Sequence, residues 1–160
     1  EGKVPAPGQF TEADTAILAQ ADALYAASRA AMEKQNIKGW LDAVWGVVAD
    51  CNRYFAGEEP GAKSKTDPAR RDTILYVTAE VVRQVAILAQ PVMPESAGKL
   101  LDLLGQSAEQ RAFTSLGASH RLVAGLALPV PAGVFPRFID PEEEAKRAGQ
   151  PKPQKGKKGS

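Results

Sequence analysis

Three long stretches of this chain place apolar residues at three- and four-residue steps, and this spacing predicts three amphipathic α-helices. They cover about residues 11–35, 36–55 and 67–90 of the 160-residue chain. Their main apolar members are Ile17, Leu18, Ala21, Leu24 and Tyr25, then Ile37, Leu41, Val44, Trp45, Val48, Cys51 and Phe55, and finally Ile74, Val77, Val81, Val85 and Leu88. Since such helices bury their apolar stripes against one another, we expect an all-α, antiparallel up-and-down helix bundle.

Residues suited to helix capping mark the boundaries of these stretches. Thr11 followed by Asp14 resembles a capping box, and Asn36 can cap the second helix. Asp67 is a good N-cap, and Pro68 suits the first position of the third helix. The agreement of caps with periodicity supports the predicted helix starts.

Beyond the third helix the expected elements are shorter. A fourth helix is expected over residues 94–104, and Ser107 can cap one or two further turns. The helical period then disappears, and Gly and Pro break the sequence too often for a central strand. The segment through Phe135 and Phe138 is expected to wrap irregularly over the bundle, with its aromatic rings covering apolar surface.

Two tryptophans and one asparagine of the second helix carry separate expectations. Trp45 lies on the apolar stripe and is expected in the core, whereas Trp40 is one residue off it and is expected to cover the first helix or to stay partly exposed. Asn52 is the polar member of the stripe. Its amide is expected to hold a backbone group near the helix end or in the following loop, with a ligand-facing role as the alternative.

The composition excludes several classes of protein. The single cysteine, Cys51, rules out a disulfide framework and fits a reducing compartment, and the single histidine, His120, lies in a predicted loop. No phosphate-loop, dinucleotide, zinc-protease or nucleophile-elbow motif occurs, so we expect no catalytic, cofactor or metal site in the chain. No apolar run approaches a membrane span and no signal pattern is visible, so no membrane association and a cytoplasmic location are expected.

The net charge of +1 hides an uneven distribution. Six basic and no acidic residues lie between Ala145 and Ser160, which leaves fourteen basic and nineteen acidic residues, a net charge of −5, in the rest of the chain. Residues 141–160 are of low complexity and are expected to form a disordered basic tail. Such a tail is a solvated terminus or gives weak, salt-dependent affinity for phosphate backbones.

The stretch between Phe55 and Pro68 is polar, contains two glycines and a proline, and is expected to be a long loop. Long loops between packed helices are usually functional or disordered, and binding residues collect on loops that a scaffold holds. We therefore expect the recognition surface of the chain in this stretch.

The motifs around this loop keep an order and spacing that resemble the anticodon-binding domain of bacterial methionyl-tRNA synthetases. They are Asn52-Arg53-Tyr54, Glu59-Pro60, Lys65, Thr73-Ile74-Leu75-Tyr76, the run from Glu80 to Leu88, Pro91-Val92-Met93-Pro94, Leu104-Gly105 and Phe135-Pro136-Arg137. The resemblance covers about residues 1–140, which we take as one helical domain of the class I synthetase type, truncated at its N-terminus. It implies a module that binds the anticodon stem-loop of methionine tRNA, beside a catalytic domain of the parent synthetase. ATP and zinc would belong to that catalytic domain, so the enzymatic activity would be the parent's.

The chain departs from the family pattern in two ways. The family usually has Pro-Trp where this chain has Pro60-Gly61, and that Trp stacks on an anticodon base. The family also reads the anticodon with residues of a preceding helix, which this chain does not include. If that helix normally closes the bundle, the predicted helices should expose an apolar strip, which is a typical interaction site.

The resemblance implies an RNA-facing set made of Asn52, Arg53, Pro60, Gly61, Lys63 and Lys65. Lysines of this kind contact phosphates, or they are ordinary solvated loop lysines. Arg70 and Arg71 lie unfavourably at a helix N-terminus; pairing with Glu58 and Glu59 is the expected reason, and an anionic partner is the alternative. The alternative to an anticodon-binding module is a structural or protein-interaction bundle that has lost anticodon recognition.

Overall fold

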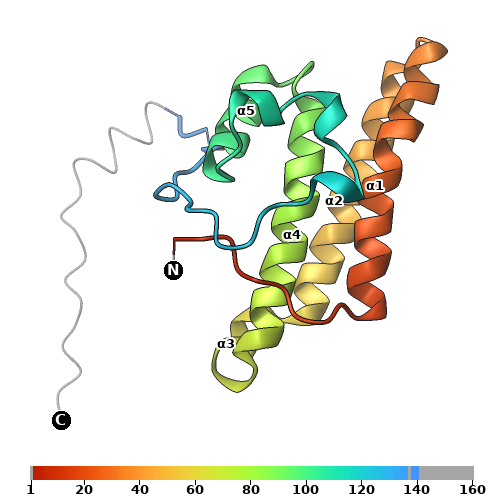
Figure 1. Cartoon of the computed structure of the whole chain (residues 1–160). Helices are drawn as coiled ribbons and strands as arrows, with labels where there is room; N and C mark the ends of the chain where they lie inside the picture. The colour runs from red at the N-terminus through yellow and green to blue at the C-terminus, as the bar shows by residue number, and fades with distance from the viewer. Residues whose placement is uncertain (1, 137, 141–160) are drawn as a thin grey trace.

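Three long helices lie side by side with alternating direction in the computed structural model, which describes residues 2–136 and 138–140 (Figure 1). They are α1 (Glu12–Glu33), α2 (Ile37–Glu58) and α4 (Pro68–Ala89). A short helix of seven residues, α3 (Pro60–Thr66), joins α2 to α4 at one end, and α5 (Pro94–Leu103) packs beside α4 at the other. The predicted all-α, up-and-down bundle is confirmed.

The predicted caps form as expected. The Thr11 hydroxyl accepts from the Asp14 N–H at 3.3 Å, and the Asp14 carboxylate accepts from the Thr11 N–H at 2.9 Å, which completes a capping box. Asn36 accepts from the Gly39 N–H at 2.8 Å, and Asp67 accepts at 3.0 Å from the N–H three residues further on. Each bond satisfies a backbone donor that has no partner inside the helix.

The prediction of a loop between Phe55 and Pro68 is wrong in its conformation. Glu59 is the single residue between α2 and α3. It adopts a left-handed backbone conformation (φ 47°, ψ 55°), which ends α2 and redirects the chain into α3. Pro60 is buried and occupies the first position of α3, where its fixed φ and missing N–H suit a helix start. The polar composition concealed this helix because only Pro60 of α3 is buried.

The core lies between α1, α2 and α4. Its buried apolar members include Ile17, Leu18, Ala21 and Leu24 from α1, Trp40, Val44, Val47 and Cys51 from α2, and Val77, Val81, Ala86, Ile87 and Leu88 from α4. The expectation that Trp45 lies in the core is wrong, since Trp45 is 46% exposed. Trp40 is buried at 6% exposure and lines a pocket together with Ser28 and Met32 of α1, as expected of a side chain that covers the first helix. The face of α2 that packs inward runs through residues 40, 44, 47 and 51, and Trp45 lies beside it.

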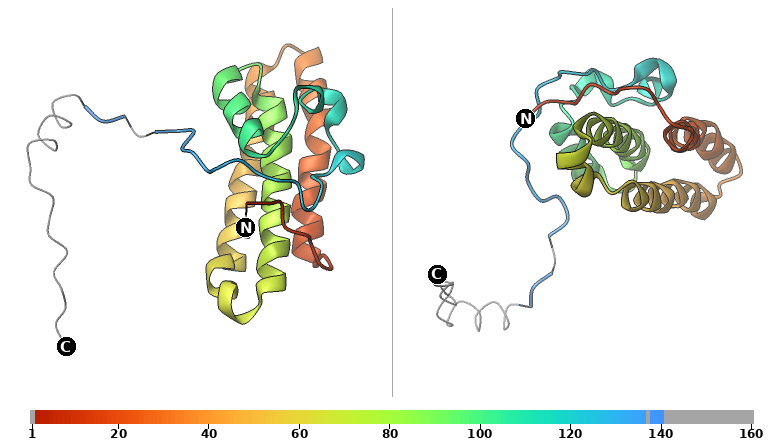
Figure 2. Two further views of the ribbon diagram at one scale, coloured as in Figure 1. Left: turned by 60° about the vertical axis from the view of Figure 1, so that its left-hand side comes forward. Right: turned by 90° about the horizontal axis from the view of Figure 1, so that it is seen from below.

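The chain after α5 wraps back over α4 without regular secondary structure. It contains three short 3-10 turns, Ala108–Gln110, Phe113–Ser115 and Ala118–His120. The segment then meets the N-terminal residues, where Val4 exchanges two backbone hydrogen bonds of 2.8 Å with Gly125 and Leu126. Figure 2 shows the two terminal segments side by side along one face of the bundle. The only bridge in the described residues pairs Lys3 with Ala127, so the absence of a central strand is confirmed.

A buried polar cluster holds this wrap in place. Glu80 and Arg83, on neighbouring turns of α4, are 0% and 1% exposed and pair at 2.8 Å. Arg83 also donates to the Ser115 carbonyl at 2.7 Å, and Glu80 accepts from the Leu122 N–H at 2.9 Å. The expected aromatic cover is wrong for Phe138, which is 89% exposed, because polar bonds and buried leucines anchor the segment.

Candidate nucleic-acid interface

The end of α2, helix α3 and the start of α4 form one corner of the molecule, which we call the α3 corner (residues 57–70; Figure 1). Arg70 fixes this corner from inside. Its guanidinium donates to both Asp14 carboxylate oxygens at 2.5 and 2.9 Å and lies 2.8 Å from the Glu58 carboxylate. The Tyr54 hydroxyl donates to Asp14 at 2.6 Å. One arginine thus ties together α1, α2 and α4.

The electrostatics of this network are governed by the burial of Asp14, whose side chain is fully buried. Burial alone would raise the pKa of Asp14, but the hydrogen bonds from Arg70, Tyr54 and the Thr11 backbone lower it to about 2. Burial and the adjacent Asp14 raise the pKa of Tyr54, and the hydrogen bond to Asp14 raises that of Arg70. Asp14 and Arg70 therefore both stay charged at neutral pH, and their ion pair, together with the contacts to Tyr54 and Glu58, holds the three helices together.

The corner presents few free groups outward. Gly61 is exposed, and a Cβ added there meets nothing within 4 Å, so the backbone leaves open space for a side chain to begin at this position. Lys63 is half-buried and engaged: its ammonium donates to the Glu58 carbonyl and lies 3.9 Å from the Glu58 carboxylate. Lys65 is exposed, and it makes no ion pair among the described residues. Of the two predicted phosphate-contacting lysines, Lys65 is the one left free.

The predicted residues of α2 do not face the same way. Arg53 is exposed, pairs with Asp50, and borders a shallow depression of about 460 Å³ between α1 and α2. Asn52 is also exposed, makes no side-chain hydrogen bond to any described residue, and lines a different hollow between α2 and α4. The expected bond of the Asn52 amide to a backbone group is therefore wrong for the described residues.

The expected pairing of the two arginines is confirmed in part. Arg70 pairs with Glu58, as predicted, but its closest contact is with Asp14. Arg71 pairs with its neighbour Asp72 at 2.6 Å, not with Glu59. Asp14 and Tyr54 were missed because the capping-box pattern already explained Asp14. The antiparallel order of the helices predicts that the start of α1 lies near the end of α2, but not which side chains meet there.

A second feature lies on the other side of α2. We call it the apolar groove: a hollow of about 550 Å³ between α2, α4 and α5. Its lining includes Trp45, Val48, Phe55, Val82, Val85, Met93, Leu100 and Phe135. Trp45, Phe55 and Phe135 are all exposed there, so the predicted apolar strip is present.

No group of three or more metal-ligating side chains occurs in residues 2–136 and 138–140. His120 is exposed, and among the described residues its ring makes a hydrogen bond with the neighbouring Ser119 hydroxyl at 3.0 Å. None of the helices in this part of the chain is long and apolar enough to cross a membrane. Arg137 and the expected basic tail of residues 141–160 lie outside the described residues.

Comparisons with known proteins show which family the chain belongs to and which solved structures share its fold. A family model described as the anticodon binding domain of methionyl tRNA ligase matches residues 4–150. Methionine–tRNA ligase of Brucella melitensis is 54% identical over 144 residues, which are 90% of this chain and 28% of the relative, and that of Rhizobium meliloti is 55% identical over 142 residues. The crystal structure of the free Mycobacterium tuberculosis methionyl-tRNA synthetase superposes with a TM-score of 0.82 at 50% identity, covering 88% of this chain and 29% of that one. The chain spans about 28% of the length of the curated relatives it matches, and it belongs to the family of methionyl-tRNA ligase anticodon-binding domains.

Proposed function

We propose that the α3 corner docks on the anticodon stem-loop of methionine tRNA and positions that tRNA for ATP-dependent aminoacylation by the catalytic domain of a parent synthetase. The match of the anticodon-binding family over residues 4–150 is the observation that carries this proposal. Unpaired anticodon bases are the part of a tRNA that proteins read most readily. The chain itself supplies binding and orientation, and the chemistry belongs to the parent.

The corner suits this role because it is rigid and projects beyond the bundle. Arg70 locks three helices together beneath it, and the six residues of α3 after Pro60 face solvent fully or in part. We propose that Lys65 contacts a phosphate, while Gly61 lies where the family places its stacking Trp. Arg53, Asn52, Pro60 and Lys63 complete the proposed set, with Pro60 acting through the position it gives to α3.

Substitution of Gly61 by Trp tests the proposal directly. Stacking of one base on an aromatic ring contributes about 1–3 kcal/mol, so Gly61→Trp should raise affinity for a methionine anticodon stem-loop by roughly 5- to 150-fold. Gly46→Trp is the matched control, since Gly46 also has nothing within 4 Å of an added Cβ but lies in the middle of α2. Both variants are titrated with stem-loops that carry either the matching or a scrambled anticodon. The comparison distinguishes recognition of the anticodon bases from nonspecific attraction to RNA. Equal affinity of Gly61→Trp for both stem-loops would contradict the proposal.

The salt dependence of the same titration separates the basic tail from the corner. Deleting residues 145–160 should flatten the slope of affinity against salt concentration and leave the preference between stem-loops unchanged. If the preference disappears with the tail, recognition does not lie in the α3 corner.

The apolar groove supports a second function, that of a protein-interaction bundle. Trp45, Phe55 and Phe135 leave an apolar surface that an amphipathic helix could cover. We propose that its occupant is a helix of the parent synthetase, since this chain spans about 28% of its relatives. Light scattering of the chain should show self-association at high concentration, or an apolar dye should bind. A clean monomer without dye binding would argue against an open groove.

A further inference from the structure

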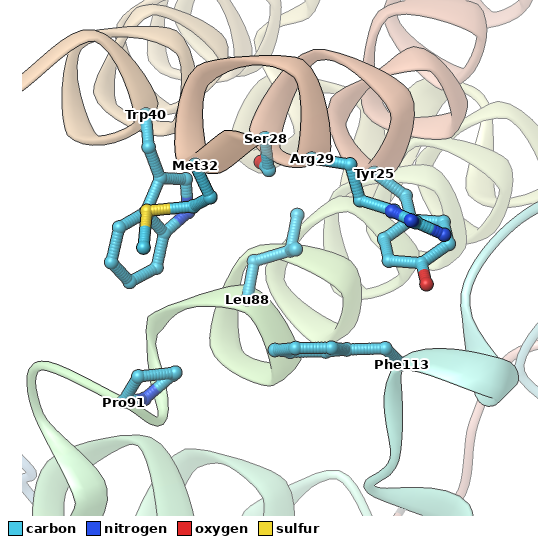
Figure 3. Close-up of a pocket in the computed structure, with 8 residues that line it drawn as sticks. All are labelled: Tyr25, Ser28, Arg29, Met32, Trp40, Leu88, Pro91 and Phe113. Atoms are coloured by element: carbon cyan, nitrogen blue, oxygen red, sulfur yellow. The ribbon is translucent and has the colours of Figure 1, made fainter. Parts of the chain in front are cut away.

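A separate pocket lies at the end of the bundle opposite the α3 corner, and neither RNA binding nor the apolar groove uses it. We call it the end pocket; it has a volume of about 280 Å³ and lies between the end of α1, the start of α2, the end of α4 and the turn at Phe113 (Figure 3). Its boundary is almost entirely apolar. For scale, a dry apolar cavity of about 150 Å³ holds one benzene ring, so this pocket has room for a bicyclic ring system.

Aromatic and sulfur-containing side chains form most of its walls. Trp40 and Met32 close one side, and Phe113 lies across from them, as Figure 3 shows. Tyr25 packs against Phe113 with ring centroids 5.9 Å apart and an interplanar angle of 45°. Flat rings and a polarizable thioether favour a planar aromatic occupant, because ring faces and edges and sulfur make specific contacts with aromatic ligands.

One polar atom in the wall has no partner. Among the described residues, Ser28 Oγ is the one buried side-chain oxygen or nitrogen without a hydrogen bond, and Ser28 is 5% exposed. Hydroxyls inside helices commonly bond the carbonyl four residues earlier, as Thr73 and Thr78 do here at 3.0 and 2.8 Å. Ser28 does not, and its side chain lines the pocket beside Leu88. An unmet buried hydroxyl costs free energy, which a ligand atom can recover.

Arg29 adds a positive charge at the edge of the pocket. Its guanidinium lies 3.6 Å from Glu33, and both side chains are largely exposed, so this pairing is weak. Arg29 is therefore available to contact the face of an aromatic occupant.

We propose that the end pocket binds a small planar aromatic molecule of bicyclic size that carries one hydrogen-bonding group for Ser28 Oγ. The apolar walls hold the ring system, and the Ser28 hydroxyl fixes its orientation. Sites of this kind are mostly apolar with a few placed polar groups, which is the pattern seen here. The inference does not rest on the proposed RNA binding, because the pocket shares no lining residue with the α3 corner.

Indole and benzothiophene are the probes, since they match in shape and differ in whether a ring N–H is present. Titrated into the isotope-labelled chain, indole should shift the backbone amide resonances of Ser28, Arg29 and Phe113, with a Kd of roughly 0.1–1 mM for a ligand of this size. Ser28→Ala should weaken indole binding by about 3- to 10-fold and leave benzothiophene binding unchanged. Since this variant removes an unsatisfied hydroxyl, its Tm should not fall.

Phe113→Ala removes a wall and should weaken both probes, while Phe55→Ala is the matched control, since it truncates a similarly exposed ring in the apolar groove. Absence of saturable binding would overturn the proposal. Shifts centred on Trp45 and Val85 would also overturn it, because they would place the probe in the apolar groove. An equal effect of Ser28→Ala on both probes would refute the assigned hydrogen bond.

Discussion

Replacing Arg70 by Met leaves two carboxylates of the α3 corner without the cation that they share. Asp14 is fully buried and the Arg70 guanidinium lies 2.5 Å from its carboxylate, so the substitution leaves a buried negative charge without its cationic partner. Breaking a buried ion pair by removing one partner costs about 3–5 kcal/mol. Asp14 keeps its bonds from Tyr54 and the Thr11 N–H, so the expected loss is at the lower end, about 3 kcal/mol. Urea unfolding should show this as a midpoint lower by about 1–2 M.

The pH dependence gives this prediction a second, independent readout. The pKa of Asp14 is lowered from 3.8 to about 2 in the folded chain, so folding favours the ionised carboxylate. The corresponding stabilisation, about 2 kcal/mol, is fully present above pH 3.8 and is lost as pH falls toward 2. Because the Arg70 hydrogen bond is the largest of the contributions that lower this pKa, Arg70→Met should lose much of this dependence.

Arg71→Met is the matched control for Arg70→Met. Arg71 is the next residue on α4, but its pairing with Asp72 is at the surface, with about a third of each side chain exposed. Its replacement should change the free energy of unfolding by about 0–1 kcal/mol at every pH. Equal losses for the two variants, or an unchanged acid-unfolding profile for Arg70→Met, would refute the assignment of Arg70 as the residue that locks the corner.

Two pairs of substitutions test the packing. Trp40→Ala should destabilise the chain by about 3–5 kcal/mol because Trp40 is buried, whereas Trp45→Ala should cost less than about 1 kcal/mol; urea unfolding at pH 7 measures both, and the reverse order would contradict the assigned core. Gly105→Ala should lower stability by about 1–2 kcal/mol, since Gly105 has φ +66° and an added Cβ would lie 3.1 Å from Leu126. Gly98→Ala, in the open interior of α5, should raise the Tm by a few degrees, and a similar rise for Gly105→Ala would show that its backbone is not constrained.

The long helices could be predicted because their signals are local. Apolar spacing and caps such as Thr11, Asn36 and Asp67 act within one or two turns, and the structure places the helix starts at those residues. The assignment of Trp45 to the core failed because α2 has apolar residues on two neighbouring faces. Spacing alone gives a period and not the direction of the partner helices, so it could not decide which face is buried.

The polar clusters could not be predicted from the sequence because their members are far apart in it. Arg70 contacts Asp14 across 56 positions, and Glu80 accepts from the Leu122 N–H across 42. Charged residues on a helix usually face solvent, so Glu80 and Arg83 gave no sign of complete burial. The same limit applies to Ser28, whose missing partner becomes visible only once its neighbours are placed.

The charges of the α3 corner also bear on how strongly it can bind RNA. The negative charges of Asp14 and Glu58 are balanced by the positive charges of Arg70 and Lys63, so these four side chains together contribute no net charge. Lys65 is then offset by the exposed Glu59, which makes no ion pair among the described residues, and Asp67 adds one further negative charge. A corner without surplus positive charge offers little attraction to phosphates, and binding by this chain should depend mainly on contacts with unpaired bases. Gly61 provides no ring for stacking, so under the proposed function an aromatic side chain at that one position should add more binding than added lysines would.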